Sequence, residues 1–318
     1  MSAIHIIHEN HEWSQPLFEA LWQRGAAFVD WHMGAGLLDL NRAPPAGVFY
    51  NRMSASSHTR GHRYSPEYTG AVLTWLESHG AQVINPAEAL RLELSKVAQY
   101  QALQAFGVRT PRTFAALGRD AIVKAAGQFD GEFITKHNRA GKGLGVKLFR
   151  STEALVSYVD GPEFEPSVDG ITLVQHYIKA PTPHITRVEF VGGKLMYAVK
   201  VDTSEGFELC PADVCAVADA FCPSGEAAGE KFEIIDRFNH ELVPRYEALL
   251  QKHGIGVAAF EFITDEHGQA YTYDINTNTN YNARAEARVQ VSGMNTLAAF
   301  LAEQLDRAAC CSAERVAA

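Results

Sequence analysis

Two segments in which apolar and polar residues alternate constrain the fold more than any other feature of this chain. Residues 258–264 and 270–276 follow this pattern, and the residues between them, Asp265 to Gln269, include a glycine. Such a pattern predicts two antiparallel β-strands joined by a short turn. A second alternating pattern surrounds Gly192 and Gly193. We therefore expect antiparallel β-hairpins in the second half of the chain.

The hairpin at 258–276 carries two carboxylates and an amide. If its turn is centred between residues 267 and 268, Glu261 and Asp274 stand directly opposite each other. Alternation then puts Asp274, Asn276 and the asparagine two residues later on one side of the strand. Carboxylate and amide oxygens are the ligands that Mg²⁺ or Mn²⁺ takes together with phosphate oxygens. A solvated acidic face is the alternative interpretation of this pattern.

The hairpin at Gly192 and Gly193 carries basic residues on its polar face. If Val191 pairs with Lys194, then Arg187, Glu189 and Lys200 lie on the face opposite the apolar one. Arg187 and Lys200 are therefore expected to converge on one ligand. An ordinary solvated sheet face is the alternative here as well.

The first part of the chain has a different pattern. Short apolar runs at residues 3–7, 26–29 and 47–50 predict buried strands, and a helical stretch at 15–24 separates the first two. This succession indicates an α/β domain. Since 318 residues correspond to about two domains at roughly 150 residues each, a second domain is expected to follow.

Three helix starts are predicted from capping residues. Ser65 is expected to cap a helix that runs to residue 80, and Asn85 with Glu88 is typical of a capping box. Ser95 is expected to cap a third helix, with Lys96 in its first turn. The helix dipole disfavours a cation at that position, so an anion near Lys96 would compensate it.

The charge of the chain is acidic overall but basic in two places. A formal net charge of −9 argues against a general electrostatic grip on nucleic acid or on an anionic membrane. Residues 41–64 and 136–150 nevertheless contain several Arg, Lys and His residues and no Asp or Glu. Two small anionic ligands, or one ligand with two charged ends, would explain these stretches. Solvated loop charges are the alternative.

The chain lacks the features of a membrane or exported protein. No apolar run approaches the roughly 18 to 20 residues of a membrane span. Residues 1–10 contain no Lys or Arg, and their apolar stretch is too short for a signal peptide, so we expect a cytoplasmic protein. The five cysteines favour reduced thiols over disulfides or a three-thiolate metal site. They are Cys210, Cys215, Cys222, Cys310 and Cys311.

Taken in order, these elements resemble the ATP-grasp superfamily, and within it the branch of ribosomal-protein glutamate ligases and related amino-acid ligases. The resemblance extends over nearly the whole chain, and it depends on the order and spacing of the set, because a lone glycine-rich loop is weak evidence. The residues that carry it are Lys96, Lys136, the loop Gly141 to Val146, the strand Leu173 to Ile178, Arg187, Lys200, Glu261, Asp274 and Asn276.

The resemblance implies an α/β and α+β protein with the ATP-grasp fold and an N-terminal Rossmann-like pre-ATP-grasp domain. That domain would comprise residues 1–94 and the ATP-grasp domain residues 95–309, leaving a tail at 310–318. Within the ATP-grasp domain, about 110–178 would form the subdomain that clasps the nucleotide, and about 179–309 the subdomain with the metal and catalytic residues.

The resemblance also assigns roles to individual residues. It implies that Glu261, Asp274 and Asn276 bind Mg²⁺ or Mn²⁺, and that Arg187 and Lys200 act in catalysis. The residues implied in ATP binding are Lys96, Lys136, Lys142, Gly143, Gly145, Gln175, Tyr177 and Ile178. Glycines let backbone N–H groups approach phosphate oxygens, and lysine supplies a compact positive charge.

The chain departs from the pattern of the superfamily in three places. Glu261 and Asp274 reverse the usual order of Asp and Glu at the metal positions, which preserves the charge. The segment Lys179 to Pro181 lacks the acidic residue that commonly meets the ribose, and a run of asparagines from Asn276 to Asn282 replaces a segment rich in Pro and Gly.

The implied reaction transfers the γ-phosphoryl group of ATP to a carboxylate, and an amine then attacks the acyl phosphate. The implied substrates are a small carboxylate and an amine, which a protein could carry, and homo-oligomers are frequent in similar families. For the acceptor we expect Arg52, Arg60, Arg63 and Arg284, because arginine pairs bidentately with carboxylates, which suits an amino-acid or dicarboxylate substrate. Arginines of surface loops are the alternative interpretation. A small-molecule kinase and a nucleotide-binding protein without turnover are the alternatives.

Overall fold

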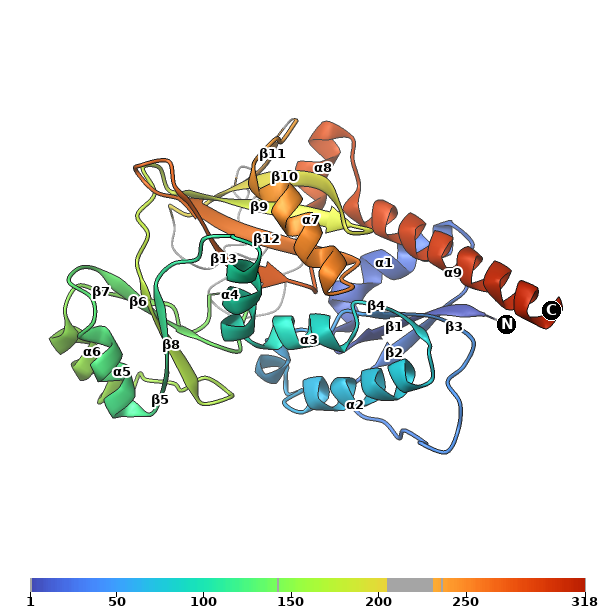
Figure 1. Cartoon of the computed structure of the whole chain (residues 1–318), viewed down its shortest axis with the longest axis horizontal. Coiled ribbons are helices and arrows are strands. Elements are labelled where there is room, and N and C mark those ends of the chain that lie inside the picture. The colour runs from blue at the N-terminus through green and yellow to red at the C-terminus, as the bar shows by residue number, and fades with distance from the viewer. Residues whose placement is uncertain (1, 142, 205–230, 236, 318) are drawn as a thin grey trace.

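The structure of the chain is a computed structural model that describes residues 2–141, 143–204, 231–235 and 237–317. Its described strands form three sheets. Figure 1 shows a small sheet with two helices at one end of the molecule, a second small sheet at the other end, and the largest sheet between them. No helix in the described ranges is long and apolar enough to span a membrane.

The N-terminal sheet is parallel, with strand order β2-β1-β3-β4. Its α/β character was predicted from the short apolar runs. Residues Ile4 and Ile6 of β1 pack toward α1, whereas Ile7 packs toward α2 on the other face. Its strands are β1 (Ala3–His8), β2 (Phe28–His32), β3 (Gly47–Asn51) and β4 (Gln82–Ile84), and its helices are α1 (His11–Gln23), the short 3₁₀ helix η1 (Ser57–Arg60), α2 (Ser65–Ser78) and α3 (Ala87–Leu94).

Two of the predicted helix caps are wrong. Ser65 is the first residue of α2 instead of its cap, and its hydroxyl donates to the carbonyl of Met33. Asn85 does not cap α3. Its backbone adopts a positive φ of 59°, and its buried side chain bonds to the backbone of Val257 and Thr277. In both cases a partner distant in sequence replaces the local capping bond.

The third predicted cap is confirmed. Ser95 precedes α4 (Lys96–Ala105), and its hydroxyl accepts a hydrogen bond from the amide of Ala98 at 3.3 Å. Capping at this residue fixes Lys96 as the first residue of the helix. The expected boundary after residue 94 falls between α3 and α4.

The second sheet along the chain, named the middle sheet for its place in the sequence, is the one at the end of the molecule in Figure 1 that carries α5 and α6. It is antiparallel, with strand order β5-β8-β6-β7. Two helices cover one face of it and pack against Phe133 and Val174 in a core of their own. The elements of this subdomain are β5 (Thr113–Leu117), α5 (Arg119–Ala126), β6 (Phe133–His137), β7 (Lys147–Phe149), α6 (Thr152–Val159) and β8 (Ile171–His176).

The largest sheet is also antiparallel, with strand order β11-β10-β9-β12-β13. One of its faces packs on α4 and α7 through residues such as Phe190 and Phe260. The elements are β9 (His184–Val191), β10 (Lys194–Asp202), β11 (Phe232–Ile235), α7 (Leu242–Lys252), β12 (Val257–Thr264), β13 (Ala270–Asn276), α8 (Ala283–Val289) and α9 (Gly293–Ala317). The expected tail from residue 310 lies within α9.

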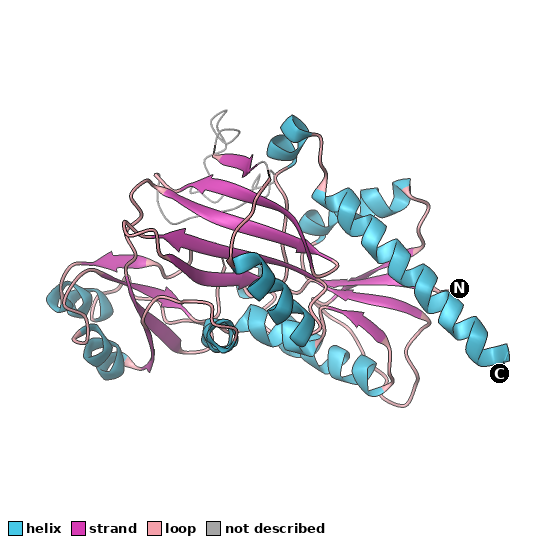
Figure 2. Ribbon diagram, turned by 45° about the horizontal axis from the view of Figure 1, so that its top comes forward, coloured by secondary structure: helices cyan, strands magenta, loops and turns pink. Residues whose placement is uncertain are grey.

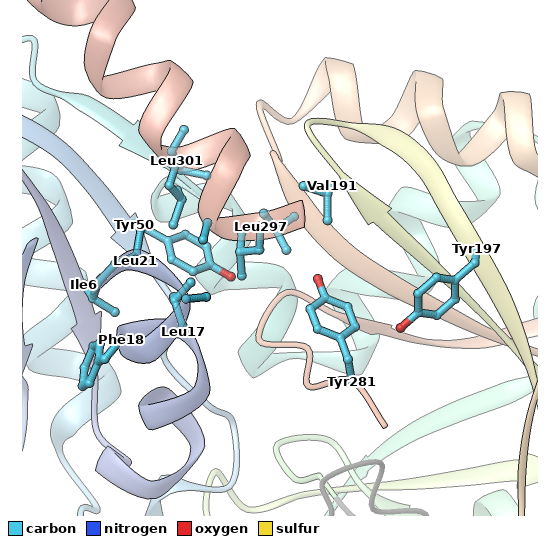
Figure 3. Packing of buried hydrophobic residues seen from close by; sticks show 14 of the residues in the cluster. Ile6, Leu17, Phe18, Leu21, Tyr50, Val191, Tyr197, Tyr281, Leu297 and Leu301 are labelled. Atoms are coloured by element: carbon cyan, nitrogen blue, oxygen red, sulfur yellow. The ribbon is translucent and has the colours of Figure 1, made fainter. Parts of the chain in front are cut away.

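The N-terminal and largest sheets share one hydrophobic core. Helix α9 packs on α1 and β3, so that it lies along the N-terminal sheet (Figure 2). Figure 3 shows Leu297 of α9 beside Tyr50 of β3, with Val191 of β9 in the same cluster. This shared core fixes the carboxyl end of β3 next to the segment that follows β13.

Candidate functional site

A pocket of about 400 Å³ lies between the middle sheet and the largest sheet. Apolar side chains from both sheets, including Ile134 and Ile263, line it together with a few charged groups. Eight of the residues predicted to bind ATP or metal lie in its wall. They are Lys96, Lys136, Gly143, Gln175, Tyr177, Ile178, Glu261 and Asp274. The pocket therefore joins residues that are up to 178 positions apart in the chain.

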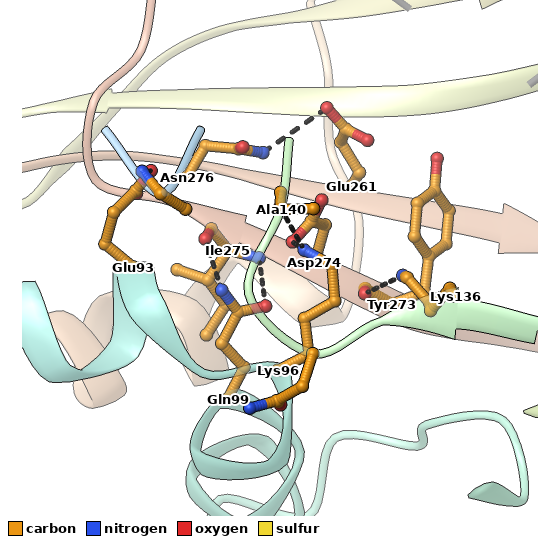
Figure 4. Close-up of polar contacts among 12 residues, drawn as sticks. Glu93, Lys96, Gln99, Lys136, Ala140, Glu261, Tyr273, Asp274, Ile275 and Asn276 are labelled. Atoms are coloured by element: carbon orange, nitrogen blue, oxygen red, sulfur yellow. Dashed lines mark hydrogen bonds and ion pairs between the residues drawn. The ribbon is translucent and has the colours of Figure 1, made fainter. Parts of the chain in front are cut away.

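Two buried lysines project into this pocket (Figure 4). Lys96 Nζ lies 2.9 Å from Asp274 Oδ1 and donates to the carbonyl of Ala140. Lys136 Nζ has only neutral hydrogen-bond partners among the described residues, the hydroxyl of Tyr100 and the carbonyl of Tyr273. Burial lowers the pKa of Lys136. A cation held in this way fits an anionic ligand, because its charge lacks a carboxylate in contact.

The three predicted metal ligands lie together, as expected. Glu261 stands opposite Asp274 across β12 and β13, and Asn276 Nδ2 lies 3.4 Å from Glu261 Oε1 (Figure 4). The turn puts the strands one residue out of the expected register, so that Phe262 pairs with Thr272. A bulge between Glu261 and Phe262 then shifts the register back, which gives the expected pair of Glu261 and Asp274. Two facing carboxylates and an amide oxygen are a donor set that fits a hard divalent cation.

Arg187 lies at the centre of a buried polar network beside these carboxylates. Its guanidinium donates to Glu261 and to Glu189, both at 2.6 Å, and to the hydroxyl of Thr279. Thr279 in turn donates to Glu189, whose pKa is raised by burial. Sequence reasoning put Glu189 on the correct face but gave it no role, and it missed Thr279, since the chain after β13 has no periodicity.

The expected convergence of Arg187 and Lys200 is wrong. A bulge between Leu195 and Tyr197 shifts the register of β9 and β10, so that Arg187 stands opposite Val199. Lys200 therefore pairs with Thr186, so its side chain lies on the face of the sheet opposite Arg187 and is exposed.

The glycines of the predicted phosphate loop have conformations that side chains disfavour. Gly143 and Gly145 have positive φ angles of 76° and 73°. A Cβ atom on Gly145 would lie 2.2 Å from the ring of His137, so the position admits glycine alone without rearrangement. Gly145 itself is not among the pocket-lining residues, and Lys142 lies outside the described residues.

The predicted strand Leu173 to Ile178 borders the pocket with its carboxyl end. Tyr177 and Ile178 line it, but the side-chain amide of Gln175 is committed to the hydroxyls of Tyr100 and Thr113 at 2.8 Å each. Gln175 was expected to bind ATP, but this side-chain nitrogen is already bonded to protein hydroxyls. Tyr100 was missed, although it lies four residues after Lys96 and thus on the same helical face.

Glu93 is a further residue that sequence reasoning missed. Its buried carboxylate accepts hydrogen bonds from the amide of Ala55 and from the amides of Thr277 and Asn278. It therefore joins the loop after β3 to the segment that follows the ligand Asn276. In the sequence it is one of three charged residues in α3, so nothing distinguishes it from Glu88 and Arg91.

The four predicted acceptor arginines have different surroundings. Arg60 pairs with the buried Glu9, Arg63 pairs with Glu67, and Arg284 is exposed on α8. Arg52 is only 2% exposed and donates to the side-chain oxygens of Asn278 and Asn280, both from the predicted asparagine run. Of the cysteines, Cys310 is exposed, whereas Cys210, Cys215 and Cys222 lie outside the described residues. The side chain of Cys311 is likewise outside what the structure describes.

Solved structures with the same architecture cover almost the entire chain. A RimK-domain ATP-grasp protein from Sphaerobacter thermophilus DSM 20745 has a TM-score of 0.63 at 18% identity, covering 94% of this chain and 99% of its own. D-cycloserine synthetase DcsG has a TM-score of 0.63 at 18% identity, covering 95% and 100%. The ATP-grasp ligase PsnB, complexed with a minimal precursor, has a TM-score of 0.67 at 15% identity, covering 96% and 99%.

Comparisons of sequence find no such relative. No family model matches the chain, and no curated protein sequence matches it. At these identities the structural similarity establishes the fold, and the prediction from the ordered lysines, glycine loop and carboxylates is confirmed at that level. The chain therefore has the ATP-grasp fold.

Proposed function

We propose that this protein is an ATP- and Mg²⁺-dependent ligase that joins a carboxylate to an amine and releases ADP and phosphate. The observation that carries the proposal is the pocket in which two buried lysines face two cross-strand carboxylates. The ligases DcsG and PsnB have the same fold, which supports ligase chemistry over other uses of a nucleotide.

The pocket is suited to ATP in both its apolar and its charged part. Ile134, Ile178 and Ile263 would cover the faces of the base, with the backbone after β8 at its edge. Lys96 and Lys136 would bind the phosphates, and the loop at Gly143 would approach them with its backbone N–H groups. Lys136 then gains the anionic partner that it lacks among the described protein groups.

Glu261, Asp274 and Asn276 would hold the magnesium ion. Their oxygens suit it, and the two carboxylates are now neutralised by Arg187 and Lys96. When bound, Mg²⁺ neutralises phosphate charge and orients the phosphates for transfer. Two structures of PsnB contain Mg and ADP, which supports the proposal that a nucleotide and magnesium bind together in this fold.

In the proposed reaction a substrate carboxylate attacks the γ-phosphorus, and ADP leaves. The resulting acyl phosphate is attacked by an amine, which forms the amide, loses a proton and releases phosphate. Arg187 lies beside the carboxylates, where its cation would offset charge on the transferred group. No nucleophile from the protein is required.

The acceptor is proposed to bind near the arginines of the N-terminal domain. Arg52 is the strongest of the four candidates, because Arg60 and Arg63 are paired with Glu9 and Glu67. The amine could be free or carried on a protein, since PsnB is a ligase complexed with a peptide precursor.

The proposal is tested by phosphorus NMR of the protein with MgATP and pools of amino acids, dicarboxylates and small amines. We expect ADP and free phosphate to accumulate only when a carboxylate and an amine are both present. Phosphate that appears on an acceptor would replace the ligase with a kinase. Intact ATP that binds without turnover in every pool would instead support a nucleotide-binding protein.

A further inference from the structure

Three buried polar groups without partners in the described part of the chain lie near one another, between the N-terminal domain and the segment after β13. They are Nη1 of Arg52 and the hydroxyls of Tyr50 and Tyr281. Arg52 follows β3 directly, and its charge acts on both tyrosines. Figure 3 shows the hydroxyl ends of Tyr50 and Tyr281 directed toward the region between the two domains. Such groups are rarely left unpaired, because each loses its hydrogen bonds to water.

No carboxylate in the described part of the chain forms a hydrogen bond or an ion pair with Arg52. Its hydrogen bonds within the described ranges go to the neutral amides of Asn278 and Asn280. Glu9 is the acidic group whose charge acts on Arg52, but its carboxylate is bonded to Arg60 and His62. A guanidinium that is only 2% exposed, without a carboxylate or phosphate, is costly. An anion bound at Nη1 would remove this cost.

This group of residues is continuous with the proposed catalytic site. Asn278 and Asn280 follow the metal ligand Asn276 by two and four residues, and Thr279 between them receives a hydrogen bond from Arg187. An anion at Arg52 would therefore be held beside the reacting groups but apart from the phosphates, which lie on the Lys136 side.

We propose that Arg52, Tyr50 and Tyr281 form a subsite for a substrate carboxylate that ATP does not activate. A carboxylate accepts two hydrogen bonds from a guanidinium and further ones from hydroxyls, which matches these donors. The inference rests on the proposed ligase function and narrows its substrates. One of them is a small molecule with a free carboxylate, either an amino acid as the amine or a dicarboxylate as the acyl donor.

The subsite is deeply buried. Arg52 is 2% exposed and Tyr50 0% exposed, so the group that reaches Nη1 of Arg52 must be small. A carboxylate meets this requirement.

Thermal unfolding tests the subsite by binding alone, so the reaction need not be identified first. The protein is saturated with magnesium and a non-hydrolysable ATP analogue, and its unfolding midpoint is measured against four probe pools. These are free amino acids, the matching amino-acid amides, dicarboxylates and their diamides. We expect one free-acid pool to raise the midpoint and the matching amide pool to have no effect. The pool that acts identifies the source of the carboxylate.

Variants assign the effect to these residues. Tyr281→Phe removes one hydroxyl and Arg52→Gln removes the charge, and each is expected to weaken apparent acid binding at least tenfold. Tyr246→Phe is the matched control, since its hydroxyl bonds to Thr272 in the core of the largest sheet. Loss of one buried hydroxyl there is expected to leave acid binding unchanged. Tyr281→Phe keeps the test valid if Arg52→Gln does not fold.

Two results overturn the subsite. One is the absence of any carboxylate-dependent shift in the wild type, and the other is an equal shift in the wild type and both variants. If the ATP analogue itself still raises the midpoint in those cases, only the subsite fails, and the phosphorus NMR experiment decides the proposed function separately. If the analogue has no effect on the wild type, the proposed function fails as well.

Discussion

Replacing Lys136 with methionine is expected to weaken ATP binding without weakening the fold. A hydrogen bond to a charged group contributes roughly 1.5 to 3 kcal/mol, so Lys136→Met should lower the affinity for ATP about 10- to 150-fold. The side chain is 6% exposed and has neutral partners among the described residues. Its place in the pocket is therefore explained by binding rather than by stability.

The same substitution should not lower the unfolding free energy. The hydroxyl of Tyr100 keeps its bond from Gln175, and the carbonyl of Tyr273 keeps its bond from Tyr100, so the substitution strands neither group. Methionine fills a similar volume and carries no charge to desolvate. We expect the unfolding free energy to stay unchanged or to rise by about 1 kcal/mol, measured by urea denaturation.

The pH dependence provides a second readout for Lys136. Burial holds its pKa below the ordinary value of 10.5 in the folded protein. At a pH between the lowered pKa of the folded protein and 10.5, Lys136 binds more protons in the unfolded chain than in the folded one. The unfolding free energy of the wild type should therefore rise as the pH approaches 10.5, relative to that of Lys136→Met.

Calorimetric titration with MgATP measures the affinity of both proteins. Lys147→Met is the matched control, because Lys147 lies in the same subdomain but is 42% exposed and pairs with Glu163. Unchanged affinity in Lys136→Met would refute the assignment to phosphate binding. A loss of more than about 2 kcal/mol in the unfolding free energy would instead show that Lys136 stabilises the fold.

Three further predictions concern the metal site, the loop and the junction of domains. Glu261→Gln with Asp274→Asn should abolish Mg²⁺-dependent ADP formation while circular dichroism stays native, and full activity would place the metal elsewhere. Gly145→Ala should weaken MgATP binding at least tenfold by calorimetry, because its Cβ would meet His137, and wild-type affinity would refute that reasoning. Asn85→Ala should lower the unfolding free energy by about 2 to 4 kcal/mol in urea, since it removes buried backbone bonds and leaves a positive φ, and a change below about 1 kcal/mol would contradict it.

The sequence predicted the site best where the alternation of a strand placed chemically matched side chains on the same face. Alternation in β12 and β13 placed Glu261 and Asp274 on one face, and their pairing survived although the turn was misjudged by one residue. The same reasoning failed for Arg187 and Lys200, because a bulge inserts one residue without a signal in the sequence.

Residues with partners distant in the chain could not be predicted. Ser65 and Asn85 have the composition of caps, yet a carbonyl from another element competes for each side chain. Glu93 and Thr279 became recognisable as site residues only when folding brought the loop after β3 and the segment after β13 together. The conformational preferences of the neighbouring residues therefore determined neither the caps nor these site residues.

The shared core of the first and last parts of the chain determines which parts can move. Leu17 of α1, Tyr50 of β3 and Leu297 of α9 pack in one cluster with Val191 of β9, so separating these sheets would expose apolar surface at a high cost in free energy. The middle sheet has its own cluster around Phe133 and borders the rest across the pocket, with Leu173 of β8 also reaching the core under the largest sheet. The protein should therefore behave as two rigid bodies instead of three, and a nucleotide held between them would set their relative orientation.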